Sequence, residues 1–151
     1  MKVAVVAALN LPSESIFAVI TDIPHHVDWM DEPLELISLS NGPARFGTTW
    51  EQNADRFGKK LVTLNTCNLY EKNRKFGWKS QKPFPAQVTF LLEPDGGDFT
   101  KLTWMVESEE AGAGIVQLAE PLLIKQTHEM IQKSLAGLRT YLRTKKQDNA
   151  V

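Results

Sequence analysis

The stretch LAEPLLIKQTHEMIQKSLAGLRTYL, residues 118–142, decides the fold that we expect for this chain. Its apolar residues recur at intervals of three and four, which is the period of an amphipathic helix. Pro121 falls inside the segment, and we expect it to kink or interrupt the helix. One apolar side must cover another apolar surface, which the rest of the chain has to supply. The expected apolar side consists of Leu118, Leu122, Leu123, Gln126, Met130, Ser134, Leu138 and Tyr141.

The residues before Gly112 supply that surface, because they are typical of strands joined by tight turns. The valine-rich run 3–9 predicts a first strand, and Pro12 then precedes an apolar spacing typical of a helix. A second short helical turn is expected around His25 to Trp29. From Leu34 onward the period changes to two, with Gly, Pro, Asn and Asp at hairpin spacing. Together these segments predict about seven strands.

Hairpin geometry predicts which side chains share a face of the sheet, since directly paired residues in an antiparallel ladder point the same way. We take Gly58-Lys59 and Lys72-Asn73 as two-residue turns. Bulky apolar groups then gather on one face and charged groups on the other. The expected pairs are Thr48 with Leu69, Trp50 with Cys67, Gln52 with Asn65, Cys67 with Trp78 and Leu69 with Phe76.

The fold class expected is therefore α+β. A curved antiparallel sheet of about seven strands wraps around a long C-terminal helix, with two short helices after the first strand. We expect residues 1–145 to form a single ligand-binding domain and residues 146–151 to form a flexible tail.

Composition narrows the partners and the compartment. The formal net charge is −1 and no face is strongly basic, so we expect no nucleic acid partner. No run approaches the roughly 20 apolar residues of a membrane-spanning helix, so we expect no integral membrane segment. Cys67 is the only cysteine, which excludes an internal disulfide and fits a reducing, cytoplasmic location. We expect a monomer or a homodimer.

Several short motifs carry a resemblance that spans nearly the whole chain. They are Leu11 to Phe17, Thr21-Asp22 with Trp29, Phe46 to Thr49, Leu69 to Glu71, Lys75 to Trp78, and Phe90 to Gly97. Their order and spacing resemble the polyketide cyclase/dehydrase and lipid-transfer group. This group belongs to the helix-grip (SRPBCC) superfamily, which includes START domains and the birch pollen allergens. The resemblance implies a helix-grip fold, and its members include lipid carriers, hormone receptors, aromatase/cyclases and co-chaperones.

The candidate site is a pocket for a small hydrophobic or aromatic molecule between the sheet and the C-terminal helix. An aromatic stripe by itself is more often core, and the resemblance favours a cavity instead. A few polar groups on an apolar face are what orient a small ligand. The candidate ligand-binding residues are Thr48, Trp50, Gln52, Asn65, Cys67, Trp78, Phe90, Trp104, Leu122, Gln126 and Met130.

The expected lining suits binding better than catalysis. The register places no Asp, Glu, His or Lys at its centre, and general acid–base chemistry needs such a group within reach. We identify no catalytic residue and expect neither a cofactor nor a metal. The adjacent pair His25-His26 is expected in a polar surface turn, and Cys67 is expected to act as a small buried apolar residue.

Two alternatives stay open. The first is a cyclase, dehydratase or hydrolase acting on such a molecule in the same pocket. There Thr48, Gln52 and Asn65 would orient the substrate, and an edge group such as Arg56 or Glu129 would transfer a proton. The second is a protein interaction module, which would need an exposed apolar patch.

Overall fold

The computed structural model describes residues 1–31, 34–56, 59–82, 85–108 and 120–149. Within these residues, seven strands and two short helices precede one long helix, so the expected α+β class is confirmed. In chain order the elements are β1 (Lys2–Leu9), α1 (Ser13–Ile20), the 3-10 helix η1 (Ile23–Asp28), β2 (Leu34–Leu39), β3 (Thr49–Arg56), β4 (Lys59–Glu71), β5 (Lys75–Lys82), β6 (Ala86–Pro94), β7 (Thr100–Glu107) and α2 (Glu120–Asn149).

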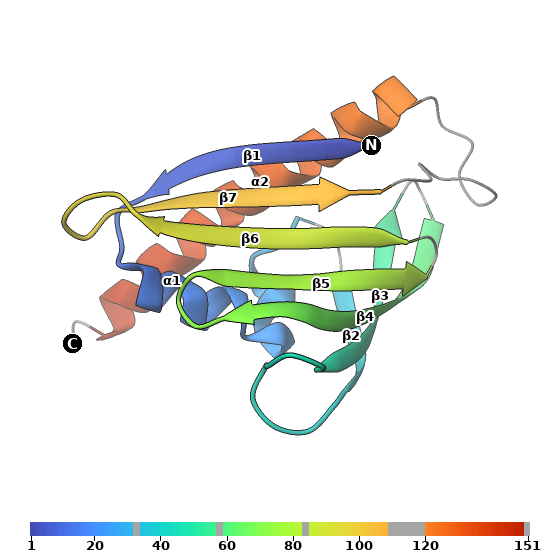
Figure 1. The fold of residues 1–151 in the computed structure, drawn as a ribbon, viewed down its shortest axis with the longest axis horizontal. Coiled ribbons are helices and arrows are strands. Elements are labelled where there is room, and N and C mark those ends of the chain that lie inside the picture. The colour runs from blue at the N-terminus through green and yellow to red at the C-terminus, as the bar shows by residue number, and fades with distance from the viewer. Residues whose placement is uncertain (32–33, 57–58, 83–84, 109–119, 150–151) are drawn as a thin grey trace.

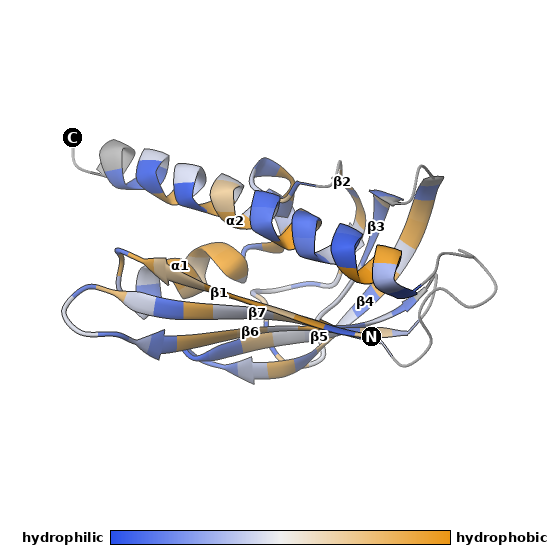
Figure 2. Cartoon of the chain, turned by 90° about the horizontal axis from the view of Figure 1, so that it is seen from above, coloured by the Kyte–Doolittle hydropathy of each residue, from blue (hydrophilic) through white to orange (hydrophobic). Residues whose placement is uncertain are grey.

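The strands form one antiparallel sheet in the order β1-β7-β6-β5-β4-β3-β2. The first strand of the chain thus lies beside the last, and every other neighbour follows directly in sequence. Helix α2 runs diagonally across one face of the sheet (Figure 1). Figure 2 shows the sheet and α2 as two layers, with the orange apolar bands of α2 turned toward the sheet and α1 on the same side. The predicted helix-on-sheet arrangement is confirmed.

Alternating burial along the strands explains why one face of the sheet needs a cover. In β1 every second residue is buried, from Val3 to Leu9, and the residues between them are exposed. β7 repeats the alternation with Leu102, Trp104 and Val106. Because side chains of a strand point to opposite faces in turn, all these apolar groups face α2 and the short helices.

The ladder between β3 and β4 is displaced from the expected register. It closes with Arg56 opposite Lys59, and Trp50 therefore lies opposite Asn65. The displacement amounts to two residues, so each side chain keeps its predicted face. Three predicted pairs were therefore wrong, namely Trp50 with Cys67, Gln52 with Asn65, and Thr48 with Leu69. In the structure Gln52 lies opposite Thr63. The Thr48 carbonyl accepts a hydrogen bond from the Cys67 N–H.

The loop between β4 and β5 has three residues instead of two. Glu71 lies opposite Lys75, and Asn73 between them has φ 64°. A three-residue hairpin loop needs one residue in the left-handed region, and asparagine accepts that conformation more readily than most residues. The predicted two-residue turn was therefore one residue too short.

A β-bulge between Cys67 and Leu69 absorbs the extra loop residue. Cys67 consequently lies opposite Trp78, and this predicted pair is confirmed. On the loop side of the bulge the register differs by one, so Phe76 pairs with Tyr70 and the predicted pair of Leu69 with Phe76 was wrong. Phe76 is fully buried, whereas Leu69 is only partly buried.

Helix α2 begins at Glu120, which places Pro121 in its first turn. A proline there removes no hydrogen bond from the helix, because the first four N–H groups have no partner within it. The predicted kink was wrong, and α2 runs without a break in Figure 1. The helix continues to Asn149, beyond the polar residues around Lys145 where we expected a tail to start. Leu118, expected on the apolar side, lies outside the described residues.

The buried side of α2 is rotated slightly from the expected one. Leu138 and Ser134 are buried as expected, but Leu122 is 42% exposed and its neighbour Leu123 is buried. The larger aliphatic side chains decide the rotation, because burying them yields more free energy than burying Gln126 or Tyr141. The buried residues of α2 are Leu123, Ile131, Ser134, Leu135, Leu138 and Leu142.

Two contacts fasten the segment after η1 to α2. The N–H of Asp31 donates a hydrogen bond to Ser134 Oγ at 3.0 Å. Gly137 allows the two backbones to approach closely, since a Cβ atom at this position would collide with the Trp29 carbonyl oxygen.

Among the described residues, no helix is both long and apolar enough to cross a membrane.

Candidate functional site: a cavity between the sheet and α2

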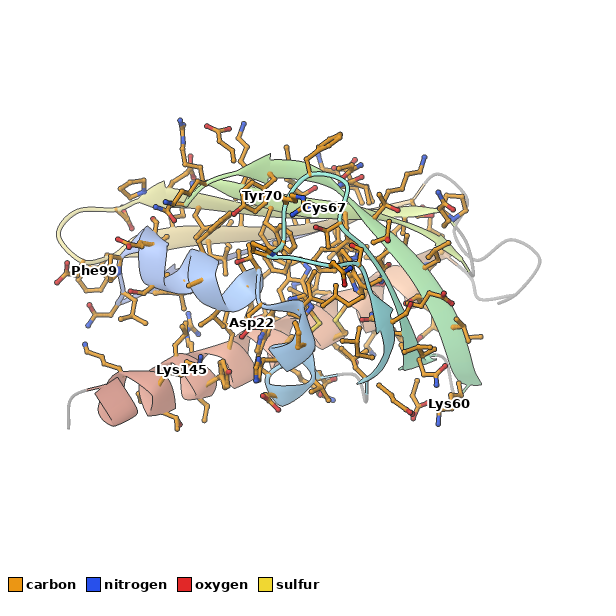
Figure 3. All side chains as sticks on the ribbon, turned by 90° about the horizontal axis from the view of Figure 1, so that it is seen from below. Asp22, Lys60, Cys67, Tyr70, Phe99 and Lys145 are labelled. Atoms are coloured by element: carbon orange, nitrogen blue, oxygen red, sulfur yellow. The ribbon has the colours of Figure 1, made fainter. Side chains whose placement is uncertain are left out.

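A cavity of about 250 Å³ lies between the first turns of α2 and the ends of the strands that face them. The lining includes the end of β3 at Asp55, so the cavity lies toward the end of the molecule marked by Lys60 in Figure 3, away from Phe99. Its lining residues are Met1, Met30, Asp31, Gln52, Asp55, Asn65, Trp78, Ser80, Ala86, Val88, Trp104, Val106, Leu123, Gln126, Thr127 and Met130.

Six of the residues singled out from the sequence are brought together around this cavity. Trp78 and Trp104 form part of its apolar wall, and Gln52 and Asn65 add amides from β3 and β4. Gln126 and Met130 come from the helix above them. The β3–β4 ladder is displaced by an even number of residues, so Gln52 and Asn65 stay on the predicted face of the sheet although their predicted pairing was wrong.

The other five sequence candidates lie outside the lining. Thr48 is buried, and its hydroxyl accepts a hydrogen bond from the Arg45 N–H at 3.0 Å, which supports the loop before β3. Trp50, Cys67 and Phe90 are buried in the aromatic core behind the cavity. Leu122 points away from the sheet, and Leu123 lines the cavity in the place expected for Leu122.

Cys67 is fully buried, and burial raises the pKa of its thiol. Its Sγ lies 3.5 Å from the Leu69 carbonyl oxygen, as expected of a weak thiol donor. A thiol that stays protonated is a poor nucleophile. The environment of Cys67 therefore fits the predicted role of a small apolar residue.

An unbroken series of ring contacts forms the wall behind the cavity. Trp50 packs edge-on against Trp78 with ring centroids 5.4 Å apart, Trp78 contacts Phe90 at 5.7 Å, and Phe90 contacts Trp104 at 4.6 Å. Trp104 in turn meets Trp29 at 6.0 Å. The Nε1 atoms of Trp29, Trp50 and Trp104 are buried without a hydrogen-bond partner among the described residues. Each of these three rings takes part in an edge-to-face contact, in which an aromatic face can partly satisfy an N–H group.

His26 belongs to this aromatic wall, which corrects the expectation of a polar surface turn at His25-His26. Only 2% of its surface is exposed, and its ring stacks on Trp78 at 5.9 Å and meets Trp29 edge-on at 5.4 Å. His26 Nε2 lies 2.8 Å from the Ile20 carbonyl oxygen. Burial lowers the pKa of His26 to about 4, so the ring is neutral at physiological pH. His25, beside it, is exposed and contacts Asp22 at 2.8 Å.

Sequence reasoning missed His26 because it sought site residues only on the sheet and on the C-terminal helix. The 3-10 helix η1 enters the core from the side and delivers one histidine of the adjacent pair. The signal available was the spacing of Ile23, His26 and Trp29, which places these residues on one side of a three-residue turn. All three are buried.

The lining also contains two carboxylates, which the predicted acid-free face did not include. Asp31 follows η1 and does not belong to the sheet, so strand alternation could not reveal it. Asp55 is the penultimate residue of β3, where the side chain borders the opening of the cavity. Both side chains are exposed, and they therefore form part of the rim. Among the described residues no group of three His, Cys, Asp or Glu side chains is placed to hold a metal ion.

Comparison with known proteins assigns the family. The model of the family described as polyketide cyclase / dehydrase and lipid transport matches residues 1–143. The chain belongs to this family. Among curated proteins, none matches the sequence.

Solved structures of low sequence identity share the fold of this polyketide cyclase/dehydrase family member. A START superfamily protein from Mycobacterium smegmatis has a TM-score of 0.77 and 15% identity, with 95% of this chain and 97% of that chain covered. A protein from Chromobacterium violaceum has a TM-score of 0.71 and 16% identity, with coverage of 93% and 96%. The Zhui aromatase/cyclase from a Streptomyces species has a TM-score of 0.69 and 9% identity, with coverage of 100% and 96%. These similarities establish the fold alone.

Proposed function

We propose that this protein binds or transports a small hydrophobic or aromatic molecule in the cavity beneath α2. The observation that carries the proposal is a cavity of about 250 Å³ whose wall includes Trp78, Trp104, Val88 and Leu123. Protein interiors are normally packed as densely as organic crystals, and a void of this size forfeits contacts that side chains would otherwise make. A ligand of matching shape would restore those contacts.

The size and chemistry of the cavity fit a small molecule. Ligand sites are typically concave and apolar, with a few polar groups that fix the orientation of the ligand. Here the polar groups are Gln52, Asn65, Ser80 and Thr127, set in a wall of aliphatic and aromatic side chains. The family description names lipid transport and polyketide cyclisation, which supports a lipid or polyketide-like ligand.

A second candidate function is catalysis on such a molecule, of the cyclase, dehydratase or hydrolase type. The presence of Asp31 and Asp55 on the rim favours it, since a carboxylate can act as a general base. One protein of the same fold is an aromatase/cyclase. This candidate predicts turnover that is lost in Asp31→Asn or Asp55→Asn while ligand affinity changes little.

Ligand titration tests the proposed binding function. Intrinsic tryptophan fluorescence should respond to at least one compound among fatty acids, sterols and polyphenols, because Trp78 and Trp104 line the cavity. Val106→Phe should fill the cavity and abolish the response. Val62→Phe is the matched control, since Val62 is 47% exposed on the far side of the sheet and does not line the cavity. If no compound of the panel changes the tryptophan fluorescence of the wild-type protein, the proposal is refuted.

We further propose that the protein acts in the cytoplasm. A buried free thiol as the only cysteine is what a reducing compartment allows.

A further inference from the structure

We infer that the Gln52 amide recognises an uncharged hydroxyl or carbonyl group on a ligand of one or two rings, and that the cavity rejects anionic head groups. The inference rests on the proposed binding function. The inference specifies the chemistry of the ligand head group and the residue that binds this group.

Gln52 is a largely buried residue whose side-chain amide has no hydrogen-bond partner among the described residues. Its exposed fraction is 7%, and the side chain lines the cavity. The Gln52 backbone carbonyl accepts a hydrogen bond from Thr63 Oγ1 at 3.5 Å, but the side-chain oxygen and nitrogen make no contact of this kind. The described side-chain atoms that are fully shielded without a partner do not include those of Gln52, so its amide is accessible from the cavity and can pair with water or a ligand there. It offers an acceptor and two donors.

Asn65 supports Gln52 from the neighbouring strand. Its Nδ2 donates to Thr63 Oγ1 at 3.5 Å, which orients the amide and leaves its oxygen as a further acceptor. Thr63 lies directly opposite Gln52 in the ladder, so the three residues form one polar patch, of which Gln52 and Asn65 line the cavity. Neutral donors and acceptors of this kind match a hydroxyl or a carbonyl group.

The charges around the cavity disfavour an anion. Among the described residues, the lining contains no Lys, Arg or His side chain, and it contains two carboxylates, Asp31 and Asp55. Met1 lines the cavity, and its amino group is engaged by the Ser108 carbonyl oxygen at 2.6 Å and by Glu120 at 3.4 Å. A carboxylate or phosphate head group placed beside Gln52 would therefore be buried without a counter-charge, which is strongly unfavourable.

The volume limits the size of the ligand. A dry apolar cavity of about 150 Å³ can hold benzene. A cavity of about 250 Å³ accordingly suits one substituted ring or two fused rings, and it is too small to enclose a long acyl chain together with its head group.

Three compounds with one ring, one alkyl chain and different head groups test the inference. Isothermal titration calorimetry should show that 4-propylphenol binds about three- to tenfold more tightly than propylbenzene, which lacks the hydroxyl. The anion 4-propylbenzoate should bind at least about tenfold more weakly than the phenol. In two-dimensional NMR spectra, the phenol should shift the side-chain amide signals of Gln52 in the wild-type protein.

Gln52→Leu removes the amide and keeps a side chain of similar size. It should abolish the preference for 4-propylphenol over propylbenzene and leave the affinity for propylbenzene unchanged or higher. Gln132→Leu, on the exposed side of α2, is the matched control and should preserve the preference. The thermal unfolding midpoint shows whether each variant is folded, and the NMR shifts of the wild-type protein decide the matter if Gln52→Leu is not.

Equal affinities for the phenol and propylbenzene, tight binding of the benzoate, or an unchanged preference in Gln52→Leu would overturn the inference and leave the proposed binding function intact. Failure of all three compounds to bind would overturn the assigned head group and size. The proposed function itself is judged by the broader panel of fatty acids, sterols and polyphenols.

Discussion

The space beneath α2 has two halves that differ in packing although one helix covers both. Under the C-terminal half, Leu135, Leu138 and Leu142 are at most 5% exposed and belong to the continuous apolar core. Under the N-terminal half, the side chains that face the sheet border a cavity of about 250 Å³. We call these regions the packed half and the hollow half.

The short helix α1 accounts for the difference. Its residues Ile16, Phe17 and Ile20 are buried in the core that the C-terminal turns of α2 also cover. In Figure 2, α1 lies under the C-terminal part of α2 and does not reach the N-terminal part. The curved sheet and the straight helix therefore enclose space along their whole length, and α1 fills only one end of it. The position of the candidate site follows from the length of α1 as much as from the residues that line the cavity.

Truncating one leucine in each half should give the largest contrast. Leu138→Ala in the packed half should reduce the free energy of unfolding by about 3 to 4 kcal/mol, because it removes three buried carbon atoms and leaves a cavity. Leu123→Ala in the hollow half should cost about half as much, since Leu123 already borders empty space. Chemical denaturation of both variants measures the contrast. If both variants lose the same free energy of unfolding, then bound molecules fill the cavity of the hollow half as completely as side chains fill the packed half.

His26 lies where the two halves meet, and its protonation should weaken the fold. In the unfolded chain the pKa of histidine is near 6.5, and burial lowers it to about 4 in the folded protein. Between these values the unfolded state binds more protons than the folded state. The free energy of unfolding is therefore highest above pH 6.5 and declines as the pH falls toward 4. The total decline amounts to about 3 kcal/mol. Urea titrations across this pH range measure it.

The neighbouring histidine provides the control for this pH dependence. His26→Gln keeps a donor for the Ile20 carbonyl and should flatten the decline between pH 6.5 and 4. His25→Gln removes a half-exposed ring that pairs with Asp22, and the decline should persist. A decline of equal size in His26→Gln and the wild-type protein would assign it to the carboxylates and contradict the burial of a neutral His26.

Gly137→Ala should destabilise the packed half, although alanine favours helices. At an ordinary exposed position, replacing glycine by alanine stabilises a helix by up to about 1 kcal/mol. At Gly137 the new Cβ would collide with the Trp29 carbonyl oxygen and push α2 away from the segment after η1. We expect a loss of about 1 to 3 kcal/mol, measured by thermal or chemical unfolding. A gain in stability would mean that α2 is not pressed against Trp29.

The sheet and its inward face could be predicted because they depend on local alternation, which tolerates errors of two residues. The pair of Cys67 with Trp78 was predicted correctly although the loop length was not, because a bulge compensates for the extra residue at Asn73. The cavity residues Gln52, Asn65, Trp78 and Trp104 followed from the same alternation. Features of this kind are encoded in short stretches of sequence.

The features that could not be predicted depend on contacts between distant segments. Strand alternation cannot reveal that His26 enters the aromatic wall from η1, or that Asp31 reaches the rim of the cavity. The rotation of α2 was missed by about one position, because a helix with Leu122, Leu123 and Ile124 in succession presents apolar groups over a wide angle. Packing against β1 and the Trp29 segment selects one rotation among several that the sequence allows.

The smallest expected effect tests that rotation. Leu122→Ala should change the free energy of unfolding by less than about 0.5 kcal/mol, because Leu122 is 42% exposed and alanine is a strong helix former. It should also leave ligand affinity unchanged, whereas Leu123→Ala enlarges the cavity and alters affinity. If Leu122→Ala instead costs as much as Leu123→Ala, then α2 presents Leu122 to the sheet in solution. The lining of the hollow half would in that case follow the apolar side read from the sequence, and Gln126 would move inward toward Gln52.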